Sequence, residues 1–258
     1  MKICILASGS SGNSTVITTD RTSILIDAGI SAVKILSRLQ QLELDLTTLS
    51  AMVITHEHID HIRGAGPLTR KINVPLYCNR ATWDRAKHII GKVKQVHFIE
   101  PAKPFTIGDF NLKSFSVPHD ANDPIGLTIE HNSKKIGFAT DLGYPTQLIK
   151  ERLKECHALI IEFNYNRDLL LAGPYTWPMK QRIMGRKGHL SNEDACGLLE
   201  DIISEKLNHI ILAHISENNN VPDLALMCVQ ELCHRIGHNN IRFTIGNPDR
   251  QSEWIPIT

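Results

Sequence analysis

Three histidines and an aspartate crowd into residues 56–61, and this cluster constrains the chain more than any other feature. The segment reads His-Glu-His-Ile-Asp-His and directly follows the apolar, β-branched run 51–55. Such a run predicts a buried strand, and the glycine-containing segment 63–66 opens a predicted helix. Imidazole nitrogens and carboxylate oxygens are the ligands of zinc- and manganese-class ions. The segment therefore predicts a metal site on a loop that a strand holds in place.

The first half of the chain is rich in predicted strands, and the second half alternates helix and strand. The predicted strands are 3–7, 14–19, 23–27, 51–55, 74–78, 95–99, 109–117, 125–130, 135–140, 158–162, 209–213 and 241–245, and the predicted helices are 31–42, 60–71, 81–90, 145–155, 192–205 and 223–236. This order predicts two mixed sheets with helices outside them. No linker divides the chain, so we expect one domain over residues 1–258. The one long irregular stretch, 164–188, is predicted to be a functional loop or lid.

Composition narrows the class of protein. The net charge is +1, which neither indicates nor excludes a nucleic-acid partner. No apolar run approaches the roughly 20 residues that a membrane helix needs, and the run 3–7 is too short for the core of a signal peptide. The six cysteines show no Cys-x-x-Cys spacing. We therefore expect free thiols, a cytoplasmic protein and no membrane partner.

Further metal-binding residue types follow three other predicted strands. His119 follows strand 109–117, Asp141 follows strand 135–140, and His214 follows strand 209–213. Any one of them alone is more often structural than functional. Strand-end loops on one edge of a sheet are, however, where sites in α/β proteins are built. Together with residues 56–61, they predict a single site assembled from four strand ends.

This ordered set of residues resembles the signature of the metallo-β-lactamase-fold hydrolases. The resemblance implies an α/β fold, a four-layer αββα sandwich, with two divalent metal ions, zinc or manganese, with iron as another option. It implies the following ligands: His56, His58 and His119 for the first ion, Asp60, His61 and His214 for the second, and Asp141 as the bridge between them. A hydroxide shared by the two ions would attack the substrate. Asp60 is expected to take part in catalysis as well as in binding.

Longer stretches resemble one branch of that family, the YycJ (WalJ) exonucleases. The stretches are 6–14, 162–165, 185–192 and 213–219. This resemblance implies a metal-dependent phosphodiesterase that degrades DNA as a 5′-to-3′ exonuclease. Two alternatives stay open, an RNA nuclease and a small-molecule hydrolase acting on a cyclic phosphodiester or a thioester. A non-enzymatic structural metal site is disfavoured because such a site is closed by four ligands. The oligomeric state is not predicted.

His189 is the second catalytic candidate. It precedes Ser191 and Asp194, which form a Ser-x-x-Asp capping box at the start of a predicted helix. A helix N-terminus attracts anions, so His189 is placed to contact a phosphate oxygen or to protonate a leaving alkoxide. The alternative is a histidine that only caps its helix. The residues that we expect to bind substrate are Lys180, Arg182, Arg186, Lys187, Asn164 and Ser191; the basic ones are equally compatible with an ordinary solvated loop.

Overall fold

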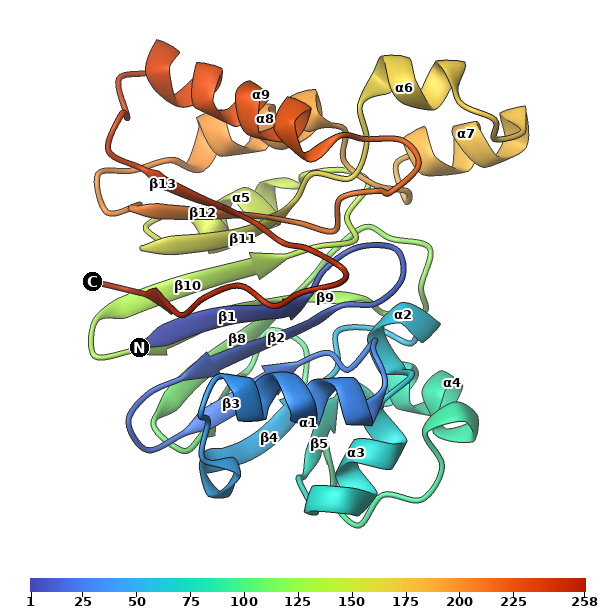
Figure 1. The fold of residues 1–258 in the computed structure, drawn as a ribbon, viewed down its shortest axis with the longest axis vertical. Coiled ribbons are helices and arrows are strands. Elements are labelled where there is room, and N and C mark those ends of the chain that lie inside the picture. Colours follow the sequence, from blue (N-terminus) through green and yellow to red (C-terminus); the bar gives the residue numbers. More distant parts are fainter.

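Two seven-stranded sheets form the centre of the protein in the computed structural model, which describes residues 1–258. The first sheet has the order β14 (Ile255–Pro256), β1 (Lys2–Ala7), β2 (Ser14–Thr18), β3 (Ser23–Ile26), β4 (Leu49–Val53), β5 (Leu76–Cys78) and β6 (Val96–Phe98). The second has the order β13 (Arg242–Ile245), β12 (His209–Ala213), β11 (Ala158–Glu162), β10 (Lys134–Ala139), β9 (Ile125–His131), β8 (Phe110–Ser116) and β7 (Pro104–Ile107). The C-terminal strand β14 pairs with β1, so the two ends of the chain lie side by side (Figure 1).

Helices cover the outer face of each sheet. The helices beside the first sheet are α1 (Ala32–Gln41), α2 (Ile59–Ile62), α3 (Ala65–Ile72) and α4 (Arg80–Ile90). The chain crosses to the second sheet between β6 and β7. The helices of the second half are α5 (Gln147–Leu153), α6 (Arg167–Ala172), α7 (Trp177–Met184), α8 (Asn192–Ile202) and α9 (Pro222–Arg235). Figure 1 shows the four layers, with the two sheets between the two sets of helices. The αββα sandwich expected from the sequence is confirmed. No helix combines the length and apolar character that crossing a membrane requires.

Three apolar cores hold the layers together. The side chains of β1 alternate between two of them: Ile3 and Ile5 face the second sheet, while Cys4 and Leu6 face α1. The parallel strands β10, β11 and β12 are buried on both faces, so their sequences are continuous apolar runs rather than alternating ones. Burying one such aliphatic side chain contributes about 1.5–3 kcal/mol. The strands that carry the site loops are therefore anchored on both sides.

The structure differs from the predicted elements in three places. The helix predicted over 60–71 is divided into α2 and α3 at Gly64, where a Cβ atom would lie 2.1 Å from the carbonyl oxygen of Ile30. The strand β7 was not predicted. The stretch 164–188, predicted to be irregular, contains α6 and α7. These two helices are too short to show a helical period, since Gly173 ends α6 and a proline lies in the first turn of α7.

Candidate metal centre

The predicted donors meet at one edge of the sandwich. Strands β8, β10, β11 and β12 run in the same direction in the second sheet, so the loops after them emerge together. Strand β4 of the first sheet delivers residues 56–61 to the same edge. The predicted ligands form three mutually close groups: His56 with His58 and His119; Asp60 with His61 and His214; and His56 with His61 and Asp141. A fourth group joins Asp141 and His214 to Glu162 and His189, and within each group the candidate ligand atoms lie within 4.8 Å of one another.

The first group contains three imidazoles. The ring centroids of His56 and His58 are 4.7 Å apart, and those of His56 and His119 are 5.3 Å apart. The Nδ1 atom of His56 lies 3.0 Å from the Thr55 hydroxyl, and that of His119 donates to the carbonyl of Gly188 at 3.0 Å. In both rings Nδ1, the outer nitrogen that points away from the group, contacts a hydroxyl or a carbonyl. The other nitrogen, Nε2, therefore faces the group.

The second group joins the helix α2 to the loop after β12. Oδ2 of Asp60 lies 3.3 Å from Nε2 of His61 and 3.5 Å from Nε2 of His214. The outer nitrogen of His61 donates to Asp27 at 2.7 Å, and Asp27 also accepts from the backbone and hydroxyl of Thr55. A buried carboxylate thus fixes both the orientation and the tautomer of His61.

Asp141 lies between the two groups. Its Oδ2 is 3.4 Å from Nε2 of His61, and its Oδ1 is 3.5 Å from His214 and 3.8 Å from His119. Burial alone would raise the pKa of Asp141, but the nearby charges of His214 and His61 outweigh it and hold that pKa well below the ordinary value. Burial, together with the neighbouring His61, lowers the pKa of His56 well below its ordinary value. The ionised carboxylate of Asp141 and the neutral imidazole of His56 are the forms that bind metals. At His61 and His214, by contrast, the nearby carboxylates, Asp141 first, outweigh burial and raise the pKa.

Backbone strain marks the same residues. Asp27, Asp141 and His214 have φ angles of 59°, 56° and 53°, in the left-handed region that side-chain-bearing residues seldom adopt. Such conformations persist where the surrounding structure fixes them, and they cluster at functional sites. The backbone N–H of His214, for example, donates to the Ser8 hydroxyl at 2.7 Å.

The donor atoms fit a metal site. Nε2 of His56, Nε2 of His214 and Oδ2 of Asp141 are buried and have no hydrogen-bond partner. Buried polar atoms are nearly always paired, and bound cations would pair all three of these atoms. The outer nitrogens of four of the histidines contact a carboxylate, a hydroxyl or a carbonyl, as is usual for metal ligands; the four are His56, His61, His119 and His214. The donors are nitrogen and oxygen without cysteine, a set suited to zinc, manganese or iron.

His189 lies beside these groups and is oriented by a residue that sequence reasoning did not single out. Glu162, the last residue of β11, is fully buried, and its Oε1 accepts from Nδ1 of His189 at 2.7 Å and from Nδ1 of His214 at 2.9 Å. The free Nε2 of His189 is therefore available to the cleft, which His189 lines. Glu162 and Asp27 both stand at strand ends, which is the signal that could have identified them.

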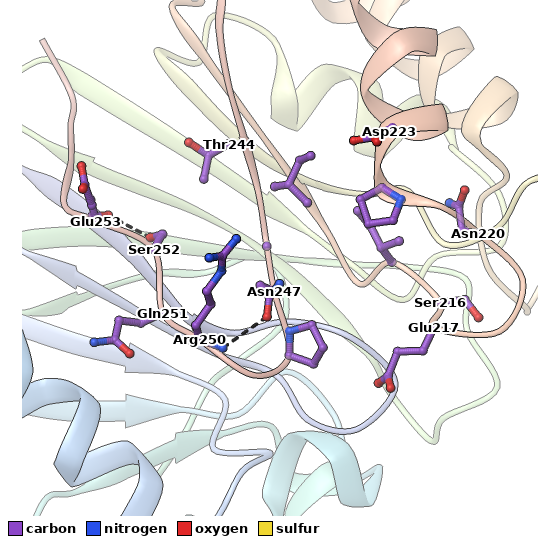
Figure 2. Close-up of a pocket in the computed structure, with 15 residues that line it drawn as sticks. Ser216, Glu217, Asn220, Asp223, Thr244, Asn247, Arg250, Gln251, Ser252 and Glu253 are labelled. Atoms are coloured by element: carbon purple, nitrogen blue, oxygen red, sulfur yellow. Dashed lines mark hydrogen bonds between the residues drawn. The ribbon is translucent and has the colours of Figure 1, made fainter.

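The donors open into a cleft of about 390 Å³, which Tyr175, Met179 and Arg182 also line. A larger cavity of about 900 Å³ lies next to it, and Ser216 lines both. Figure 2 shows this cavity between the start of α9 and residues 244–253, with Glu217, Asp223, Glu253 and Arg250 on its walls. It contains no histidine, so the smaller cleft is the one that holds the candidate chemistry.

Comparison with known proteins identifies the fold family. Residues 22–215 match the family described as "Beta-lactamase superfamily domain". The chain belongs to the metallo-β-lactamase superfamily. It is 37% identical over 235 residues to the exodeoxyribonuclease YycJ of Bacillus anthracis, covering 90% of this chain and 89% of that protein. It is 39% identical over 230 residues to the exodeoxyribonuclease WalJ of Streptococcus pneumoniae serotype 2 (strain D39 / NCTC 7466), covering 88% and 86%.

Solved structures agree with this assignment. The metallo-β-lactamase fold protein YhfI from Bacillus subtilis superposes with a TM-score of 0.74 at 19% identity, covering 98% of this chain and 99% of that one. The chain is thus a metal-dependent hydrolase of the metallo-β-lactamase superfamily, related to exodeoxyribonucleases, and its His/Asp clusters are typical of the dinuclear site of that superfamily.

The residues predicted to bind substrate do not all lie in the cleft; some line it, and others are exposed or buried elsewhere. Asn164 lines the cleft and donates to the carbonyl of His214 at 2.9 Å. Arg182 lines the cleft, where its Nε donates to Asp120 at 2.6 Å. Arg186 packs its guanidinium 4.1 Å from the centroid of the Tyr144 ring, and Lys187 is exposed.

Two of the expectations for substrate binding are wrong. Lys180 is buried, because its ammonium group turns inward and donates to the carbonyl of Leu171 at 2.6 Å. Ser191 is fully buried, and its hydroxyl accepts from the backbone of Asp194 at the N-terminus of α8. Neither side chain is available to a substrate. Asp120, which lies 3.4 Å from Nε2 of His119, was not singled out from the sequence.

Proposed function

We propose that this chain is a phosphodiesterase that degrades DNA from its 5′ end, with residues 1–258 acting as one catalytic domain. The observation that carries the proposal is the pairing of a two-centre His/Asp cluster with a histidine that Glu162 orients toward the same cleft. That combination suits the hydrolysis of a phosphodiester, which needs charge stabilisation and a proton for the leaving group. The relationship to two exodeoxyribonucleases supports DNA as the substrate.

The two groups of donors define the proposed metal sites. We assign His56, His58 and His119 to one ion, Asp60, His61 and His214 to the other, and Asp141 to both. Zinc and manganese suit these ligands, and iron is a further option. Bound divalent ions would supply Lewis acidity at the phosphate and a water molecule whose pKa is lowered toward neutrality. The side chain of Asp60 is 20% exposed, and Asp60 would take part in catalysis by helping to hold the second ion.

His189 is the proposed general acid. Its Nδ1–H is held by Glu162, so Nε2 is the atom that can carry a proton to the leaving oxygen of the substrate. Its side chain is 18% exposed, against 4% for His214, so His189 reaches further toward the substrate. Glu162 is negatively charged and fully buried, and it would stabilise the imidazolium form from which the proton is donated.

Cations beside the cleft are the proposed contacts for the DNA backbone. Arg182, Arg186 and Lys187 belong to α7 and the loop after it, while Asn164 contributes an amide from the floor of the cleft. Positive side chains that neutralise phosphates give binding that weakens as salt is added. The contact between Arg182 and Asp120 is exposed to solvent, so a phosphate can replace Asp120 as its partner.

A nuclease assay tests the proposal. The protein loaded with manganese or zinc is incubated with DNA labelled at the 5′ end or at the 3′ end, with RNA of the same sequence, and with a cyclic phosphodiester and a thioester. Release of labelled mononucleotide at early times from the 5′-labelled DNA alone is the expected result. Early release from the 3′-labelled DNA would show that the enzyme degrades DNA from the 3′ end instead. Turnover of RNA or of a small ester, without cleavage of DNA, would replace the proposal with the corresponding alternative.

A further inference from the structure

The cleft has two chemically different walls. The His/Asp groups form one wall, and α7 with the loop before it forms the other, contributing Tyr175, Met179 and Ile183. Aromatic, thioether and aliphatic side chains have no part in binding metal ions of this class or in moving a proton. The metal chemistry, the proton transfer and the phosphate contacts proposed above therefore leave the uncharged side chains of the second wall without a role.

The second wall is fixed relative to His189. Ile183 and Leu170 pack with Tyr165 in a small core of their own, and Tyr175 packs against that core. The backbone N–H of His189 donates to the carbonyl of Ile183 at 2.9 Å, which ties α7 to the segment that carries the proposed acid. The Tyr175 hydroxyl accepts from the side chain of Asn218 at 3.1 Å, which fixes the position of the ring. An aromatic ring is thus held at a set place beside the candidate reaction centre.

We infer that Tyr175 and Met179 form a subsite for the nucleobase of the nucleotide that is being removed, an inference that rests on the proposed DNA exonuclease activity. A base presents a flat π face that can pack against the tyrosine ring and the thioether, which both line the cleft. Stacking tolerates every base, as an enzyme that removes successive nucleotides requires. We expect the base to be unpaired when it lies in this subsite.

The size of the cleft is consistent with one unpaired nucleotide. Its volume of about 390 Å³ lies near the lower end of the range for small-molecule sites, roughly 300–1,000 Å³. If the base enters this subsite unpaired, the last pair of a duplex has to open first, and single-stranded ends should be the better substrates.

The test compares an intact oligonucleotide with one whose 5′-terminal residue is abasic, so that both present the same phosphodiester. We expect the manganese-loaded wild-type protein to cleave the intact strand with a kcat/KM at least about 10-fold higher. Tyr175→Ala should lower kcat/KM roughly 5- to 100-fold on the intact strand, the usual effect of losing one base stack, and should leave the abasic strand almost unchanged. Tyr175→Phe keeps the ring and should retain most of the activity on both strands.

Trp177→Ala is the matched control. Trp177 is an aromatic residue of α7 that is 58% exposed and does not line the cleft, so its removal should change neither rate. Metal content and thermal melting establish that each variant is folded and loaded. Equal losses of Tyr175→Ala on both strands would show a merely structural role and overturn the subsite, as would wild-type cleavage that ignores the base. If the wild-type protein cleaves neither strand, the proposed exonuclease function is itself wrong and the subsite falls with it.

Discussion

The two walls of the cleft are built in different ways. On the donor wall, buried strands carry the side chains, and a second buried residue holds nearly every imidazole, as Asp27 holds His61 and Glu162 holds both His189 and His214. On the opposite wall, the short helix α7, which packs on α6, carries side chains such as Met179, which is 41% exposed. The donor wall is preorganised for one chemistry, whereas this opposite wall, the α6–α7 wall, presents exposed apolar and basic side chains.

This difference suggests a division of labour. A metal site loses function when a ligand shifts, so its supports have to be rigid and buried. A surface that receives successive nucleotides of any sequence needs stacking and charge rather than fixed hydrogen bonds. Substitutions on the donor wall should therefore affect turnover and metal content, and substitutions on the α6–α7 wall should affect binding. The four predictions below test that division from the largest expected effect to the smallest.

Replacing Asp141 by Asn should have the largest effect. The change keeps the shape of the side chain but removes the negative charge that lies between the two groups of donors. We expect a loss of roughly 10³-fold or more in kcat, above the 10²–10³-fold typical of one electrostatic contact, and the loss of at least one metal equivalent. Elemental analysis and steady-state kinetics provide the measurement. Retention of two ions with near-wild-type turnover would contradict the assignment of Asp141 to both sites.

Replacing His189 by Ala should separate catalysis from metal binding on the same wall. If His189 protonates the leaving oxygen, the variant should keep both ions and its fold yet lose roughly 10²-fold or more in kcat, the scale of one positioned acid. The loss should shrink for an aryl phosphodiester, whose leaving group departs without a proton. Metal analysis and rates on the two substrates decide the matter. A missing ion, with equal losses on both substrates, would make His189 a ligand; an unchanged rate would reduce it to a structural residue.

Replacing Asp27 by Asn tests the support behind the donors. Asp27 touches no substrate, but it accepts a hydrogen bond from Nδ1 of His61 at 2.7 Å and two from Thr55. Loss of such an outer partner typically weakens metal affinity or activity 10- to 100-fold. We therefore expect activity to fall at limiting metal and to recover when metal is in excess. A variant whose metal affinity equals that of the wild type would show that the strand alone is sufficient to orient His61.

The same contrast explains what the sequence could predict. His119, Asp141 and His214 were found because each follows an apolar strand, and strand ends of one direction meet at one edge whatever the details of packing. The fold class followed from the order of the strands and helices. Asp27 and Glu162 also stand at strand ends, but they were missed as partners because their contacts join residues that are far apart in the chain.

The α6–α7 wall was less accessible to sequence reasoning. Its helices have only six and eight residues, and a glycine ends each of them, so no periodic pattern reveals them. In the sequence, Lys180 resembles its basic neighbours. In the structure its side chain turns inward because the carbonyl of Leu171 lies within reach of its ammonium group, and the sequence does not reveal that contact. A run of basic residues gives the total charge of a segment and leaves the direction of each side chain undetermined.

The smallest effect is expected for the cations of the α6–α7 wall. We expect the combined substitutions Arg182→Gln, Arg186→Gln and Lys187→Gln to leave kcat and metal content unchanged and to weaken DNA binding. Each phosphate contact to a single strand contributes about 0.7 to the slope of log affinity against log salt, so the slope should fall by up to about 2. Lys34→Gln, at an exposed position of α1, is the control and should not alter the slope. An unchanged slope in the triple variant would mean that these cations are ordinary surface charges. Any contact of the α6–α7 wall with DNA would then be made by its apolar side chains.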